Sequence, residues 1–502
     1  MLLAQHLCMN FSLHKFFEEL LYNKKDPLLF NSSFFLIFFA LFLLIYLALY
    51  KKATLRLYFL TLFSLYFFYK ASGWYVVFIL IAAVVDYNLS HLIYNEVNKR
   101  KKKILMLTSV SLNLALLFTF KYTDFFISII NDVSSSHLKL LKLGLPVGIS
   151  FYTFENLSYT VDVYRGHFKP VNRFIDYLFF LSFFPKLMMG PIVRAADFIP
   201  QINREPFVDN RQLSEGLYLL CSGIIKKMVI SDFLTANYVQ YIFDGPSRHT
   251  GIECLFAVYC YAMVIYCDFS GYSDMARGIA KWIGFDININ FLSPYQSATI
   301  TEFWRRWHIS LSTWLKDYLY IPLGGNRKGK FNQYKNLFIT MLLGGFWHGA
   351  SWNFIFWGAL HGTALALDKW RMAIAKKMKI SFRLPHGLKR AIGIIITFHF
   401  VCFCWIFFKC TTFHDSWVMI GQIFTNFRPD VAGVLFTQYR PVLIILVTAF
   451  LLHAIPVKAE VKLQQRMANW PLTAMVSYFL ICLYIAIELK QAVPIKPVYL
   501  QF

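Results

Sequence analysis

The sequence predicts an all-α protein that crosses a membrane many times. The chain has 502 residues, of which 57% are hydrophobic, 19% are aromatic and only 15% are charged. A soluble protein could not bury that much apolar surface. The apolar residues also form separate runs, and lysines and arginines gather in the loops between them. We expect about eleven transmembrane helices, together with re-entrant and interfacial helices, around a central tunnel.

The net charge of +23 raises the alternative of a nucleic-acid-binding protein. The basic residues do not alternate with aromatic residues outside the apolar runs, and they occupy the loops that orient a membrane protein. We therefore expect membrane lipids and no nucleic acid as partners. The nine cysteines include no C-x-x-C pair, so we expect buried thiols and no metal site. The beginning of the sequence lacks the pattern of a cleaved signal peptide.

The chain is expected to have four segments. Residues 1–30 are an interfacial segment, because apolar residues recur there at helical spacing. Residues 31–135 hold the N-terminal transmembrane helices, residues 136–370 the core, and residues 371–502 the C-terminal transmembrane helices. The expected spans are roughly 33–50, 55–70, 73–95, 104–130, 213–231, 252–284, 391–409, 441–456 and 472–489.

The core contains two broken apolar stretches, 145–166 and 183–194, which prolines, glycines and charged residues interrupt. Such breaks at membrane depth usually line a cavity or are buried in protein.

Charged residues also lie within the apolar span 252–284. Asp268 needs a basic partner at membrane depth, and the candidates are Arg194, Lys226 and Lys227. Asp274 and Arg277 are three residues apart, so they can pair on one helix. A structural network is the interpretation that we favour for these charges.

The stretch 301–330 carries an aromatic face at helical spacing, and His308 lies beside that face. Arg305 and Arg306 suit a cytoplasmic interface. They could anchor the helix at lipid headgroups, or they could bind an anionic donor, such as the phosphates of coenzyme A. The sequence GGNRKGK that follows lacks the spacing of a phosphate-binding P-loop.

The apolar stretch 337–367 has basic residues on both sides, so both of its flanks are expected to be cytoplasmic. It is too short for two full crossings, which need about 20 residues each. We expect a re-entrant hairpin of two short legs whose glycine-rich tip carries His348.

His348 is a polar side chain inside an apolar run, and such residues are functional candidates by default. An imidazole titrates near neutral pH, which suits a general base that deprotonates a hydroxyl. The alternative is a structural histidine that bonds a backbone carbonyl. His361 would lie about 220° round and about 20 Å along one continuous helix from His348, so we interpret it as structural.

Two of these stretches resemble one family. The sequences WRRWHISLSTWLKDYLYIPLGGNRKG and GGFWHGASWNFIFWGALHG are similar to those of the membrane-bound O-acyltransferase (MBOAT) family. Within it, the resemblance is to the bacterial branch that contains the alginate O-acetyltransferase membrane subunit. It extends over roughly residues 30–502 and makes residues 136–370 the catalytic core.

The resemblance implies that His348 is the catalytic histidine, that His308 is a second functional histidine, and that both meet in the tunnel. It implies an O-acyltransferase of the bacterial inner membrane that passes an acetyl group to a cell-envelope polysaccharide. The donor would be acetyl-CoA or another acyl thioester, used as a substrate, with no permanently bound cofactor. The implied partner is an envelope-side SGNH-type acetyltransferase or esterase.

Two other classes of function remain open on the sequence alone. A transporter of lipid-linked saccharides would also need a polar, broken core, but such transporters usually contain internal repeats, and we detect none. A non-catalytic scaffold would not need His308 and His348.

Overall fold

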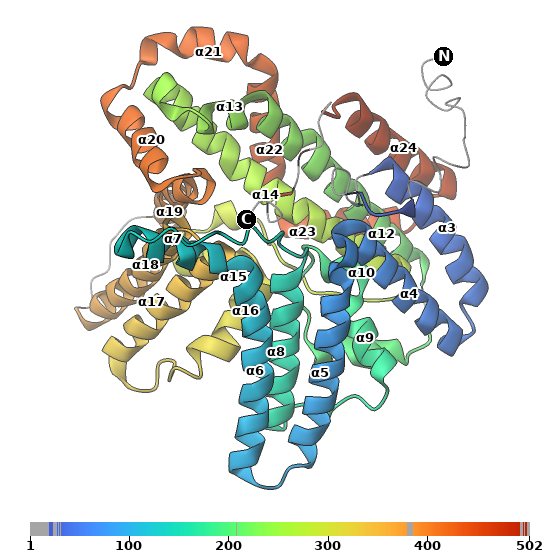
Figure 1. The fold of residues 1–502 in the computed structure, drawn as a ribbon. Helices are drawn as coiled ribbons and strands as arrows, with labels where there is room; N and C mark the ends of the chain where they lie inside the picture. Colours follow the sequence, from blue (N-terminus) through green and yellow to red (C-terminus); the bar gives the residue numbers. More distant parts are fainter. Residues whose placement is uncertain are drawn as a thin grey trace. The chain divides into compact units, whose positions relative to one another are not determined.

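The computed structural model describes residues 20–23, 28, 30, 32–206, 208–378, 385–491, 495 and 497–498. Within these ranges every regular element is a helix (Figure 1), which confirms the all-α class. The interfacial helix expected in residues 1–30 lies largely outside the described residues.

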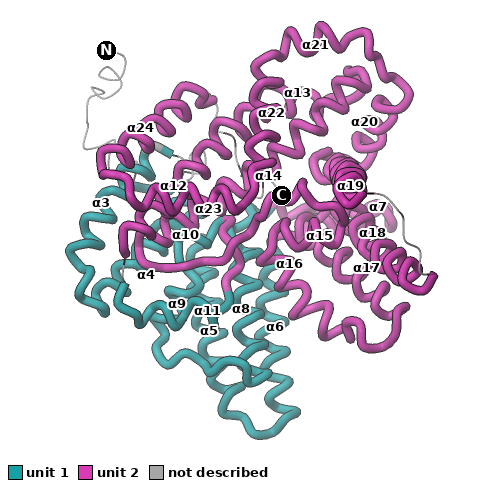
Figure 2. The backbone as a smooth tube through the Cα atoms, turned by 180° about the vertical axis from the view of Figure 1, so that it is seen from behind, with its two compact units in different colours: residues 1–120, 143–188, 194–206 teal, residues 121–142, 189–193, 207–502 magenta. Residues whose placement is uncertain are grey.

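The chain divides into two compact units (Figure 2). Unit 1 comprises Met1–Phe120, Leu143–Met188 and Arg194–Pro206, and unit 2 comprises Lys121–Lys142, Met189–Val193 and Phe207–Phe502. The four segments expected from the sequence stay a prediction, because they divide the chain by membrane organisation and not by packing.

Unit 1 is built from helices that the sequence predicted as apolar spans, from the broken stretch 145–166 and from part of the broken stretch 183–194. Its elements are α3 (Ser33–Leu49), α4 (Ala53–Ser72), the short 3-10 turn η1 (Gly73–Tyr75), α5 (Val76–Asn95), most of α6 (Lys99–Lys121), α8 (Ile149–Arg165), α9 (Phe174–Ser182), α10 (Phe184–Leu187) and α11 (Ala195–Ile202).

The parts of the two broken stretches that lie in unit 1 meet through a buried ion pair. Glu155 of α8 pairs with Lys186 of α10, and both side chains are almost fully buried. The Lys186 ammonium also lies 4.3 Å from the ring centre of Phe180. Each charge therefore neutralises the other inside the unit, as burial requires.

Unit 2 holds the remaining helices. They are α7 (Thr123–Ser134), α12 (Asn210–Ile224), η2 (Ile225–Asp232), η3 (Thr235–Val239), α13 (Gln240–Phe243), η4 (Pro246–Arg248), α14 (Gly251–Trp282), η5 (Pro294–Gln296), α15 (Ile300–Arg306), α16 (Ile309–Leu315), η6 (Lys316–Tyr320), α17 (Gly329–His348), α18 (Trp352–Lys377), α19 (His386–Lys409), α20 (Phe413–Thr425), η7 (Pro429–Val431), α21 (Ala432–Gln438), α22 (Arg440–His453), α23 (Val457–Met467) and α24 (Leu472–Glu488).

Asp268 finds its basic partner on the π-helical segment η2. Lys227 contacts Asp268 at 2.6 Å and Asp232 at 2.7 Å, which confirms one of the three partners that the sequence offered. The second Asp268 oxygen accepts a hydrogen bond from the backbone N–H of Val498 at 2.8 Å. Both carboxylate oxygens are therefore satisfied in the interior.

Asp274 is held in a similar way. Arg277 lies 3.8 Å from it on the same helix, as predicted, and Lys226 makes the closer contact at 2.6 Å. The charges of α14 thus form a structural network with η2, as the sequence interpretation favoured.

Among the described residues, four stretches are long and apolar enough to cross a membrane: Ala53–Asn95, Lys99–Lys121, Gly251–Trp282 and His386–Lys409. The pair Pro429–Gln438 and Arg440–His453, bent by 92°, would add a fifth. The polytopic class is confirmed, whereas the count of about eleven spans is not. The apolar helices α3 and α24 have only 17 residues each, and the helices of the core carry polar side chains.

The stretch 337–367 forms a helical hairpin, in which α17 and α18 lie side by side (Figure 1). Glycines permit the close approach: a Cβ added at Gly345 would lie 2.9 Å from the Gly358 Cα atom. The legs have 20 and 26 residues and are longer than expected, because both helices continue into the basic flanks. That the hairpin is re-entrant stays a prediction.

Candidate functional site

His308 lies at a break between two short helices of unit 2. It follows α15 and caps the start of α16, with a φ of 42°, a left-handed conformation that is uncommon for a residue with a side chain. Its side chain is fully buried. The ring meets Phe269 edge to face, with 4.6 Å between the ring centres. This backbone turn aims the imidazole into the interior instead of along the helix.

Asn290 fixes the turn at His308. Its backbone carbonyl accepts a hydrogen bond from Ile309 N–H at 3.0 Å, and its side-chain oxygen accepts one from Ser310 N–H at 3.2 Å. These are two of the amides that a helix start leaves without an intrahelical partner. Asn290 is therefore a positioning residue, and no pattern in the sequence identified it.

His348 is the last residue of α17, directly before the turn that leads to α18. Its side chain is buried among aromatic rings of three helices. The ring centres lie 5.0 Å from Trp347, 5.0 Å from Trp357 of α18 and 5.3 Å from Phe408 of α19. The helix end and the aromatic packing together define the direction of the imidazole.

Trp347 contacts both candidate histidines. Its ring centre lies 6.4 Å from that of His308 and 5.0 Å from that of His348. The two residues, which are far apart in the sequence, thus belong to one aromatic cluster. The roles that the resemblance gives them stay predictions.

His361 is fixed by a different partner. Its Nδ1 atom accepts a hydrogen bond from the indole N–H of Trp304 at 3.3 Å, so the proton of the neutral ring is on Nε2. The helix does break between His348 and His361, and the ring of Trp357 lies 5.0 Å from the first and 4.7 Å from the second. The hydrogen bond to Trp304 supports the structural interpretation of His361.

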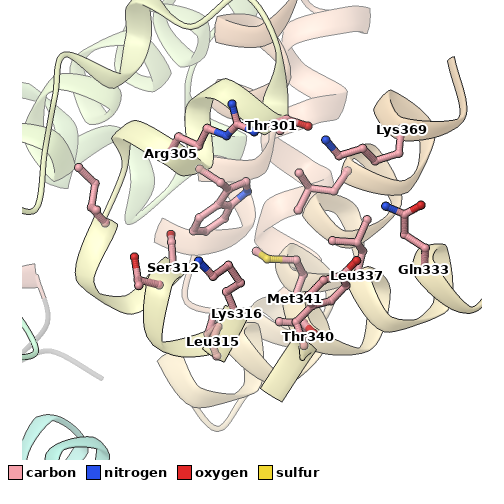
Figure 3. Close-up of a pocket in the computed structure, with 15 residues that line it drawn as sticks. Thr301, Arg305, Ser312, Leu315, Lys316, Gln333, Leu337, Thr340, Met341 and Lys369 are labelled. Atoms are coloured by element: carbon pink, nitrogen blue, oxygen red, sulfur yellow. The ribbon is translucent and has the colours of Figure 1, made fainter. Parts of the chain in front are cut away.

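A cavity of about 570 Å³ opens beside this cluster (Figure 3). Arg305 and Lys316 face it from one side, and Lys369 and Gln333 from the opposite side. Its remaining lining is mostly apolar or hydroxyl-bearing: Thr301, Trp304, Ile309, Ser312, Thr313, Leu315, Tyr320, Leu337, Thr340, Met341 and Leu365.

Three cations and an apolar interior suit a ligand with an anionic head and an apolar end. Neither candidate histidine lines this cavity, although Ile309 follows His308 and Trp304 bonds His361. The continuous central tunnel therefore stays a prediction.

The structure separates the two arginines that the sequence grouped. Arg305 faces the cavity. Arg306 pairs with Glu302, one helical turn earlier, at 2.8 Å and donates a hydrogen bond to the carbonyl of Leu292 at 3.3 Å. Arg306 thus stabilises the connection before α15, while Arg305 is available to a ligand.

Several residues of the site could not be identified from the sequence. Trp347 and Trp357 belong to the glycine-rich stretch that the sequence singled out. Their contacts with the histidines depend on how α17 packs against α18, which the sequence does not show. Lys316 and Lys369 were visible as basic flanks, and only the fold shows that they face each other. Among the described residues, no three His, Cys, Asp or Glu side chains are grouped so that they could hold a metal ion.

The sequence matches the MBOAT, membrane-bound O-acyltransferase family over residues 27–413. Because this match covers most of the chain, including α15, α16 and the hairpin of α17 and α18, the protein belongs to that family. It is therefore a membrane-bound O-acyltransferase, as the resemblance implied.

Individual relatives give a more specific picture. The chain is 35% identical to the peptidoglycan O-acetyltransferase of Helicobacter pylori, over 70% of this chain and 71% of the relative. It is 43% identical to a probable alginate O-acetylase of Pseudomonas putida, over 64% of each. It is also 29% identical to the teichoic acid D-alanyltransferase of Bacillus subtilis, over 53% of this chain and 69% of the relative. The chain thus spans about two thirds of the length of these relatives.

Proposed function

We propose that this protein transfers an acetyl group from a cytosolic acyl thioester, such as acetyl-CoA, for the O-acetylation of a cell-envelope polysaccharide. The names of the relatives support the acetyl group and the polysaccharide. The observation that carries the proposal is the aromatic cluster that joins His308, Trp347 and His348 beside a cationic cavity.

The chemistry follows from the properties of two imidazoles in a dry site. The acceptor hydroxyl attacks the carbonyl carbon of the thioester while His348 takes its proton as general base. His308 donates a hydrogen bond to the oxyanion of the tetrahedral intermediate. The C–S bond then breaks, and the leaving sulfur takes from His348 the proton that came from the acceptor hydroxyl. The products are an ester and a free thiol, so no net proton is gained or lost.

The cavity would hold the donor. Arg305, Lys316 and Lys369 can bind the phosphates of coenzyme A, since ammonium and guanidinium groups make charge-assisted hydrogen bonds to phosphate. The apolar lining would hold the rest of the donor, with the acetyl end towards the histidines. Arg306 has no part in this binding, because its guanidinium is engaged with Glu302.

The acceptor side belongs to the cell envelope. We propose that the protein lies in the bacterial inner membrane and that an envelope-side SGNH-type acetyltransferase or esterase works with it. Such a partner either presents the polysaccharide or receives the acetyl group first.

The test is to reconstitute the full chain in vesicles with a radiolabelled acetyl thioester, with and without the envelope-side partner and polysaccharide. We expect thiol release that depends on the protein and labelled acetyl ester on the envelope side. Movement of saccharide across the vesicle membrane without any thiol release would contradict the proposal and indicate a transporter. If neither thiol release nor movement of saccharide is observed, the result would indicate a non-catalytic scaffold.

A further inference from the structure

One cation near the aromatic cluster of His308, Trp347 and His348 lies outside the donor cavity. Lys121 is the last residue of α6, and its ammonium nitrogen lies 5.6 Å from the ring centre of Trp347. The same indole contacts His308 and His348. The side chain is partly exposed, and it forms no ion pair within the described part of the chain.

The neighbouring residue holds Lys121 in this place. The ring of Tyr122 stacks on Phe346 with 4.4 Å between the ring centres, and its hydroxyl donates a hydrogen bond to the Phe346 carbonyl at 3.1 Å. These contacts tie the end of α6 to the last turn of α17, the turn that carries His348. The position of the ammonium beside the cluster is therefore fixed by the fold.

Lys121 and the donor cavity contact different parts of α17. The residues of α17 that line the cavity run from Gln333 to Met341, whereas Lys121 contacts Trp347. Trp347 lies six positions after Met341, which is about 9 Å along the helix axis. A donor whose phosphates lie between Arg305 and Lys369 would not need Lys121.

The direction in which α6 crosses the membrane indicates the side of the membrane from which a ligand reaches Lys121. The helix is apolar enough to cross a membrane, and its other end carries the basic cluster at 99–103. The positive-inside rule puts that cluster in the cytoplasm, and 23 residues of helix are about 35 Å long. Lys121 is then at the outer end, where an envelope acceptor approaches.

Resting on the proposed function, we propose that Lys121 determines acceptor specificity by binding a carboxylate of an acidic, uronate-type saccharide. An ammonium group that packs on an aromatic face and forms no ion pair within the described residues can bind an anion. A sugar acid carries a carboxylate and hydroxyls on one ring. A carboxylate on Lys121 would place a hydroxyl of the same or the next ring at His348, one indole away.

The experiment compares two acceptors that differ in charge and in one methyl group per sugar acid. The full chain is reconstituted in phosphatidylcholine vesicles with a labelled acetyl thioester, and the acceptor is either a polyuronate oligosaccharide or its methyl ester. For Lys121→Gln we expect KM for the polyuronate to rise about 10- to 100-fold, the worth of a hydrogen bond to a charged group, and KM for the ester to change little. Lys121→Arg should restore most of the polyuronate affinity.

Lys139→Gln is the matched control, because it removes the same charge from an exposed position of the same segment and should change neither KM. Equal losses on both acceptors would overturn the proposal and assign Lys121 to the oxyanion or to folding. An unchanged KM for the polyuronate would also overturn it. An effect of Lys121→Gln that appears only in vesicles with anionic phosphatidylglycerol would assign the lysine to a lipid headgroup instead.

The same assay separates this inference from the function on which it rests. If the wild-type protein consumes the thioester but acetylates neither saccharide, direct recognition of the saccharide is wrong, while transfer to a protein partner survives. If it consumes no thioester even with the envelope-side partner present, the proposed function itself fails.

Discussion

His308 and His348 are 0% and 4% exposed and lie among aromatic rings, whereas Arg305, Lys316 and Lys369 face an open cavity of about 570 Å³. Both regions belong to unit 2 and share the helix α17. Water screens the cations, so each contributes modestly to binding. Water is excluded from the histidines, where a hydrogen bond or a proton transfer acts at full strength. Changes at the buried histidines should therefore alter turnover, whereas changes at the cations of the cavity should alter the affinity for the donor.

The largest effect is expected for His348→Ala. Loss of a positioned general base typically lowers the rate about 10²- to 10⁴-fold, so kcat for acetyl transfer should fall by that range while the thioester KM changes little. The measurement is transfer from a radiolabelled acetyl thioester in membranes matched for protein level. A wild-type rate would refute the role of His348.

A change at the hairpin should disturb both regions together. The Cβ of Gly345→Ala would lie 2.9 Å from the Gly358 Cα atom, so α17 and α18 must separate at a cost of about 1–3 kcal/mol. We expect a lower thermal unfolding midpoint in detergent and loss of activity in proportion. Gly421→Ala on α20 is the control, because nothing lies within 4 Å of its added Cβ. Equal stability of the two variants would show that the hairpin tolerates separation.

Arg305 and Arg306 are neighbours on α15, and their substitutions should have different effects on donor affinity. Arg305→Ala should raise KM for the thioester roughly 3- to 10-fold with kcat nearly unchanged, since an exposed charge is worth about 1 kcal/mol. Arg306→Ala should leave KM unchanged and lower stability slightly, because it breaks the ion pair with Glu302. Steady-state kinetics at low and high salt test both, and the Arg305 effect should shrink as salt rises. A KM effect confined to Arg306→Ala would reverse the assignment.

His361→Ala is expected to affect stability more than turnover. This change removes the hydrogen-bond acceptor of Trp304 and leaves a cavity, so the protein should lose about 1–3 kcal/mol of stability. The rate per folded molecule should stay within about threefold of the wild type. A loss as large as that of His348→Ala would mean that both histidines take part in the chemistry.

Part of this structure could be predicted from the sequence. Burial of Asp268 demanded a basic partner, and Lys227 was among three candidates. His348 and His308 were recognisable as polar residues in motifs of a known family. The separation of Arg305 from Arg306 was also within reach, because Glu302 precedes Arg306 by four residues, a spacing that favours an ion pair on a helix.

The rest depended on contacts between distant parts of the chain. Asn290 fixes the turn at His308 through its backbone carbonyl and its side-chain oxygen, and no motif in the sequence marks this asparagine. The position of Lys121 on Trp347 requires the end of α6 to meet the end of α17, more than two hundred residues later. The number of spans stays a prediction, because hydropathy detects apolar runs, while the lengths of α3 and α24 depend on where each helix starts and stops.

The hydrogen bond from Val498 to Asp268 has a consequence for how the protein is made. These residues are 230 positions apart, so a ribosome that adds about 5–20 residues per second reaches Val498 about 10 to 50 s after Asp268. During that interval Lys227 and Asp268 are already in the nascent chain, and one carboxylate oxygen lacks its native partner. Assembly of this interior is therefore completed late in biosynthesis. A stalled or truncated chain would expose an unfinished charge cluster to the quality-control proteases of the membrane.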